Sequence, residues 1–188
     1  MKLNNNDIKS QFLLAELESK YFKDLTLKQF DESEISAVTL DDGSQAFSDL
    51  PKVSIIGKYR IDIAKPPKSE PAVAICDWDK KVITLFRSRY EKHKEITLLH
   101  EMIHAYDHEL ARYQTWRDYL LIYLYNKISD KLGKKRMHSI LILESHPGFC
   151  ENMAHNLFFL LKSIDLDLML KRKLGTVFAY GRTKYFNI

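Results

Sequence analysis

The spacing of apolar residues in the first half of the chain changes from helical to strand-like. Apolar positions in residues 7–24 recur at steps of three and four, which predicts a helix. A β-rich stretch at 53–63, divided by Gly57, predicts a hairpin. Residues 72–76 and 82–86 are also β-rich, and the polar connector between them predicts a second, better-defined hairpin.

The second half of the chain has a mostly helical pattern. A long periodic stretch from 91 to about 130 predicts helix, with a break near 111–115. Gly133 and the basic cluster after it predict a loop, and Pro147 indicates the first turn of a further helix. Together with the two hairpins, these helices predict an α+β fold with a small, mostly antiparallel sheet.

The composition is that of an ordinary globular protein. The chain has 188 residues, of which 45% are hydrophobic and 29% are charged, so we expect one domain over residues 1–188. Cys76 and Cys150 are too few for a disulfide framework or a four-cysteine zinc ribbon. The chain starts without an apolar signal segment and has no apolar run of the ~20 residues that span a membrane. We therefore expect a cytoplasmic protein without a membrane partner, and export by a signal-independent route stays open.

One motif carries catalytic chemistry, the HExxH sequence His100-Glu101-Met102-Ile103-His104. Residues four apart project from the same side of an α-helix, so the two imidazoles could bind one Zn²⁺. Glu101 lies beside them, where it could accept a proton from a metal-activated water. The predicted helix has an apolar side, formed by Leu99, Met102, Ile103, Tyr106 and Leu110. The opposite side is polar and carries His100, His104, Asp107 and His108. This pattern predicts a helix that is buried on one side and presents imidazoles on the other.

A catalytic zinc ion needs a third protein ligand, and the residues alone leave several candidates. His108 continues the same helix, but it lies about 12 Å from His100 along the axis, too far to share one ion easily. Glu144 or Glu151 could supply a carboxylate, and Glu151 on the next predicted helix is the better placed. His146 precedes a Pro-Gly turn, from which an imidazole could face the HExxH helix.

Two segments resemble the SprT-like metalloprotease family, which includes the Spartan proteases that degrade proteins crosslinked to DNA. One is the β-rich stretch 71–85 followed by Thr97-Leu98-Leu99-His100-Glu101-Met102-Ile103-His104-Ala105. The other is Glu144-Ser145-His146-Pro147-Gly148-Phe149, which is similar to the turn that carries the family's third zinc ligand. The resemblance covers about residues 70–160 and implies a zincin-like fold around an active-site HExxH helix.

The resemblance also implies which residues are functional. His100, His104 and His146 would bind one catalytic Zn²⁺, and Glu101 would be the general base. Asp107 or a neighbouring acid would orient a ligand histidine, because such ligands usually hydrogen-bond an acceptor through their second nitrogen. Other candidates for a supporting role or for a transition-state donor are His108, His155, Tyr180 and Arg182.

The chain departs from the family pattern in its middle and in its cysteines. His104 and His146 are separated by 41 residues, and the extra length forms an aromatic helical segment at about 110–135. That segment is either an additional core helix or a lid, a substrate wall or a dimer surface. The zinc ribbon of better-known members would need more cysteines, and short basic clusters such as 131–136 permit contact with DNA without requiring it.

The motif and the resemblance together predict a zinc-dependent endopeptidase that hydrolyses protein substrates. We expect the substrate to add as a strand to a sheet edge, at residues 82–86. Two alternatives stay open. One is a dedicated effector or toxin protease that cleaves a single protein without DNA, and the other is a non-catalytic binding module that keeps the fold.

Overall fold

The computed structural model describes residues 5–23, 25, 53–66, 72–87, 94–144 and 155–178. Their order along the chain is α1 (Asn5–Tyr21), β1 (Arg60–Ala64), β2 (Ala74–Asp77), β3 (Val82–Phe86), α4 (Lys94–Leu110), α5 (Gln114–Leu132), α6 (Lys134–Glu144) and α7 (Leu157–Met169). These helices and the three-stranded sheet form an α+β fold, which confirms the predicted class for the described part of the chain.

The sheet has the strand order β1-β3-β2 and is mixed. β2 and β3 are antiparallel, with Cys76 opposite Ile83, so the predicted second hairpin is confirmed. β1 runs parallel to β3, with Ile61 opposite Ile83, so the expectation of a mostly antiparallel sheet is wrong. The predicted hairpin at 53–63 is also wrong, because the backbone N–H of Ile55 donates to the carboxylate of Glu18 and β1 alone forms a strand.

β3 is the central strand of this sheet, not an edge. Four of its five residues are buried, as expected of a strand that is covered on both faces. The predicted substrate edge at 82–86 is therefore wrong. Among the described strands, β1 and β2 form the two edges, and β2 is the edge strand that contacts α4.

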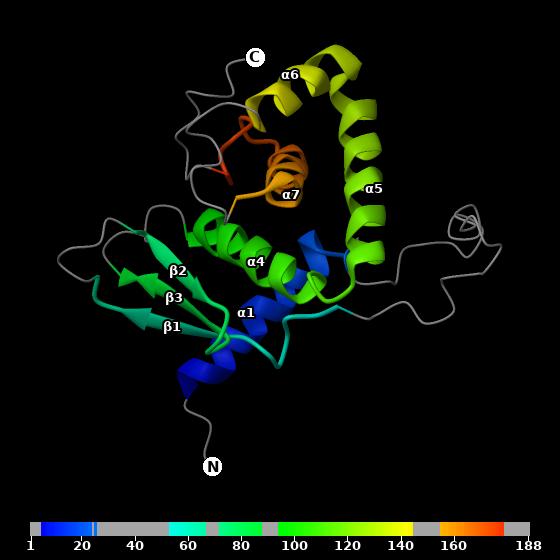
Figure 1. The fold of residues 1–188 in the computed structure, drawn as a ribbon. Coiled ribbons are helices and arrows are strands. Elements are labelled where there is room, and N and C mark those ends of the chain that lie inside the picture. The colour runs from blue at the N-terminus through cyan, green and yellow to red at the C-terminus, as the bar shows by residue number, and fades with distance from the viewer. Residues whose placement is uncertain are drawn as a thin grey trace.

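Helix α4 lies between two groups of elements, the sheet with α1 on one side and α5 to α7 on the other (Figure 1). Its predicted apolar residues are fully buried, namely Leu99, Met102, Ile103, Tyr106 and Leu110. The Tyr106 ring stacks on Phe22, and its hydroxyl donates to Glu18 of α1. The opposite side of α4 is covered as well, because α7 packs over it. As a result His100 is only 2% exposed, whereas His104, Asp107 and His108 stay partly exposed, so the predicted imidazole face is partly covered.

Most of the aromatic segment at 110–135 forms α5, a helix that packs against the core on one side. The predicted break near 111–115 is confirmed, since residues 111–113 separate α4 from α5. One side of α5 is buried and packs against α7, through Trp116, Leu120, Leu124 and Ile128. The loop predicted after Gly133 is reduced to that glycine, which has a φ of 82°. The basic residues that follow are good helix formers and begin α6.

Helix α7 begins at Leu157, after two non-helical residues. The side chain of Asn156 caps its first turn by accepting from the backbone N–H of Phe159 at 3.1 Å. His155 therefore lies in non-helical backbone immediately before the cap, whereas the predicted helix entry near Pro147 lies outside the described residues. In the described part of the chain, no helix combines the length and apolar character that a membrane span requires.

Candidate metal centre

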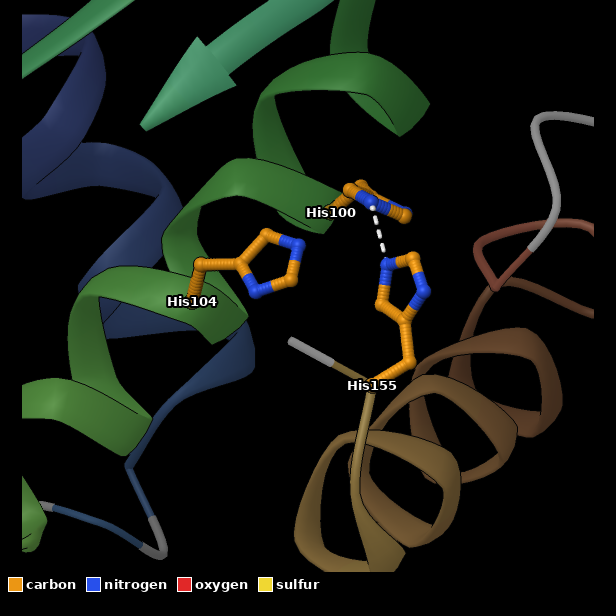
Figure 2. A group of neighbouring side chains, drawn as sticks. All are labelled: His100, His104 and His155. Carbon is orange, nitrogen blue, oxygen red and sulfur yellow. Dashed lines mark hydrogen bonds between the residues drawn. The ribbon is translucent and has the colours of Figure 1, made fainter. Parts of the chain in front are cut away.

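Three imidazoles converge between α4 and the start of α7 (Figure 2). His100 and His104 lie one turn apart on α4, and His155 faces them from the residue before the α7 cap. One nitrogen from each ring lies within 4.8 Å of the others, and the two Nε2 atoms of His100 and His155 are 3.3 Å apart. Two nitrogens that each bind a tetrahedral zinc ion at about 2.05 Å lie about 3.3 Å apart, so this spacing fits a shared metal ion.

Hydrogen bonding determines which nitrogen of His100 can bind a metal. Its Nδ1 lies 2.9 Å from the carbonyl oxygen of Val177. A carbonyl only accepts, so Nδ1 carries the proton and donates it, and in the neutral ring Nε2 then presents a lone pair. This lone pair faces His155, as a shared cation would require.

Aromatic packing holds all three imidazoles in place. The ring of Phe159 lies 4.7 Å from His100, 4.4 Å from His104 and 4.5 Å from His155, measured between centroids. Phe178 adds a contact to His155 at 5.3 Å. Burial lowers the pKa of all three histidines. The pKa of His100 is well below its usual range, and that of His104 is lowered to about 3. The three rings are therefore neutral at physiological pH, which is the form that binds metals.

We expect metal binding to release few protons at pH 6. Protons compete with the metal only below the pKa of each folded imidazole, and all three pKa values are lowered. Three unperturbed histidines would release about two protons at this pH, whereas this site should release fewer than one. Calorimetric titration with zinc in two buffers of different ionisation enthalpy measures the number. A release of two or more protons would contradict the assignment of neutral rings.

Asp167 of α7 holds the backbone segment that orients His100. Its Oδ1 accepts from the N–H of Val177 and its Oδ2 accepts from that of Thr176, both at 3.0 Å. The carbonyl of Val177 in turn accepts from His100. Burial raises the pKa of Asp167 to about 7, and the backbone N–H donors around the carboxylate oppose the rise. Asp167 is thus a positioning residue that acts on His100 through the main chain.

Replacing Asp167 by asparagine should weaken zinc binding about 10- to 100-fold, the usual effect of losing an outer support of a ligand. The amide cannot accept from both N–H groups, so the Val177 carbonyl is no longer held for His100. Competition with a chromophoric chelator measures the affinity. Ser163→Ala is a matched control, because Ser163 is also buried on α7 and, among the described residues, its hydroxyl donates within that helix, to Leu160. Equal affinities in both variants would remove Asp167 from the site.

The sequence predicted His155 as a supporting group. In the structure His155 instead completes the histidine cluster with His100 and His104. The predicted third ligand His146 lies outside the described residues, as do Glu151, Tyr180 and Arg182, and their roles stay predictions. One sequence signal could have found His155. It immediately precedes an Asn cap and an apolar helical run, and such a junction can aim a side chain at a neighbouring helix.

Asp107 and His108 lie beside the cluster with other partners. Asp107 accepts from Arg117 Nε at 2.9 Å and from the side-chain amide of Asn156. Through Asn156 it anchors the segment that carries His155, so its support of the site is indirect. His108 stacks on Trp78, with centroids 5.6 Å apart.

Glu101 is buried on α4, the helix that packs against β2. The pKa of the Cys76 thiol on β2 is raised, first by burial and next by the negative charge of Glu101. The carboxylate of the motif is therefore close enough to the edge strand for its charge to act on Cys76.

Comparisons with protein-family models, with curated proteins and with solved structures find no match to this chain. The assignment of the site rests on its geometry. Three histidines, two of them on an HExxH helix, lie close enough to hold a metal ion.

Proposed function

We propose that this chain is a zinc-dependent endopeptidase. The proposal is carried by the position of Glu101, which is adjacent to His100 and 2% exposed on the helix that supplies two of the three imidazoles. A carboxylate beside a metal site with three protein ligands is the arrangement that activates water for hydrolysis. Zinc is the metal we propose, because three neutral imidazoles with one further position open are a usual catalytic zinc site.

The residues of the site would have separate roles in hydrolysis. A zinc ion bound by His100, His104 and His155 would lower the pKa of water to about 7 and polarise the substrate carbonyl. Glu101 accepts the proton of the attacking water and donates it to the leaving amine. The ring of Phe159 limits the access of bulk water to the imidazoles, which strengthens the electrostatic interactions there.

The substrate would bind along the outer edge of β2. Among the described strands, β2 pairs only with β3, so its other edge offers backbone donors and acceptors to a peptide. β2 contacts α4, and the charge of Glu101 acts on Cys76 of this strand. A peptide added there as an antiparallel strand would bring a backbone carbonyl near the carboxylate.

Removal of zinc should abolish cleavage of an unfolded protein such as casein. The purified chain should contain about one zinc ion, and dialysis against a chelator should remove both the zinc and the activity. Stoichiometric zinc should restore the activity, whereas magnesium should not, because imidazole ligands suit zinc and oxygen ligands suit magnesium. Cleavage that persists in the zinc-free protein would contradict the proposal, as would a zinc-loaded protein that cleaves no substrate.

A further inference from the structure

A small pocket opens directly beside the histidine cluster. Its volume is about 250 Å³, and it lies between the β2–β3 connector, α4 and the starts of α5 and α7. The lining residues that matter here are Trp78, His104, Asp107, His108, Arg117 and Asn156. His104 belongs both to the cluster and to the pocket wall. A side chain bound in this pocket would therefore belong to a substrate residue next to the reacting bond.

The acceptor atoms of Asp107 and Asn156 in the pocket wall already have donors. Asp107 Oδ1 accepts from Arg117 Nε at 2.9 Å, and Asp107 Oδ2 accepts from the amide of Asn156. The amide oxygen of Asn156 accepts from the backbone N–H of Phe159. The part of the wall formed by Asp107 and Asn156 is therefore less suited to a substrate group that donates hydrogen bonds, such as an amine, than to one that accepts them.

Two donors in the wall remain available. Among the described residues, Arg117 donates to Asp107 through Nε. Its two Nη groups can then donate to a ligand. The ammonium of Lys81 can only donate, so it donates to His108 Nδ1 at 3.2 Å. Because Nδ1 accepts, the ring proton of His108 is on Nε2, which becomes a second donor.

Charged pairs lie beside the pocket. Arg117 pairs with Asp107, and both Lys58 and Lys81 pair with the single carboxylate of Glu109, at 2.9 and 2.5 Å. Two ammonium groups therefore share one carboxylate next to His108, which favours an anionic ligand on that side of the pocket. The wall also has an apolar part, because the rings of Trp78 and His108 stack within 16° of parallel and can pack against methylene groups.

We propose that this pocket binds an acidic side chain, glutamate or aspartate, of the peptide substrate. Arg117 and His108 donate to its carboxylate, and the Trp78 ring packs against its methylene groups. Arg117 is the specificity-determining residue, because its bond to Asp107 holds the guanidinium in place at 18% exposure. The inference rests on the proposed function in that the ligand is part of a substrate, but recognition of the carboxylate does not depend on catalysis.

Binding can be measured without cleavage through Trp78. This residue lines the pocket and is 41% exposed, whereas Trp116 is 2% exposed, so added ligand should change the fluorescence of Trp78 alone. The probes are N-acetylglutamate amide and N-acetylglutamine amide, added to the zinc-loaded protein. We expect the glutamate probe to bind at least about tenfold more tightly, and Trp78→Phe to remove the signal.

Arg117→Met should abolish the preference for the glutamate probe. Lys131→Met removes the same charge from an exposed position on α5 and should leave the preference unchanged. Arg117→Lys keeps the charge and should retain part of the preference, which separates recognition from misfolding. Equal binding of the two probes by the wild type would overturn the proposal. A preference that survives in Arg117→Met would overturn it too, because the carboxylate would then bind the metal directly.

Cleavage of a random peptide library separates this inference from the proposed function. An acidic residue should be enriched at one position beside the cleaved bond and lose its enrichment in Arg117→Met. Cleavage without acidic enrichment would overturn the pocket proposal and leave the protease. Selective binding of the glutamate probe without any cleavage would overturn the protease and support the pocket.

Discussion

Alanine in place of His155 is expected to weaken zinc binding at least about 100-fold. A zinc site with a full set of ligands binds its metal with about 10–16 kcal/mol, so one ligand contributes roughly 3 kcal/mol. His155 offers a nitrogen within 4.8 Å of those of His100 and His104, and Nε2 lies 3.3 Å from that of His100. Metal content by mass spectrometry and affinity by chelator competition measure the effect.

Two further histidine variants make this experiment decisive. His138→Ala changes an exposed histidine of α6 and should keep the zinc. His146→Ala tests the ligand that the resemblance predicted. If zinc is lost on changing His146 and retained on changing His155, the resemblance is right and the cluster in Figure 2 is not the ligand set.

Glutamine in place of Glu101 is expected to lower kcat by about 10²- to 10⁴-fold while zinc stays bound. Glutamine has the shape of glutamate but cannot accept the proton of the attacking water, and this is the size of a general-base contribution. Burial of Glu101 at 2% exposure leaves little space for a bulk water to replace the carboxylate. Steady-state cleavage of a quenched-fluorescence peptide, with metal content measured on the same sample, gives both quantities.

Glu95→Gln is the matched control for Glu101→Gln, because it makes the same change on the exposed first turn of α4. It should retain full activity. Loss of zinc from Glu101→Gln would show that the carboxylate supports the metal and is not the base. Unchanged kcat in a zinc-loaded Glu101→Gln would remove Glu101 from the mechanism and favour a binding module that keeps the fold.

Local features of the chain were predictable from the sequence, because neighbouring residues determine them. The helical period of α4 and its break before α5 follow from the spacing of apolar residues. The β2–β3 hairpin follows from two β-rich runs with a short polar connector. The HExxH spacing also requires only a helix, since a separation of four residues brings His100 and His104 to the same side.

Features that join distant segments were decided by the tertiary structure. β1 pairs in parallel with β3, and this long-range pairing makes residues 82–86 the centre of the sheet. The carbonyl that orients His100 belongs to Val177, which is 77 residues away in the chain. His155 joins the cluster because α7 packs on α4, and no local pattern encodes that packing. Side-chain spacing in one helix can place two ligands, but a third ligand and its supports come from the way separate elements pack.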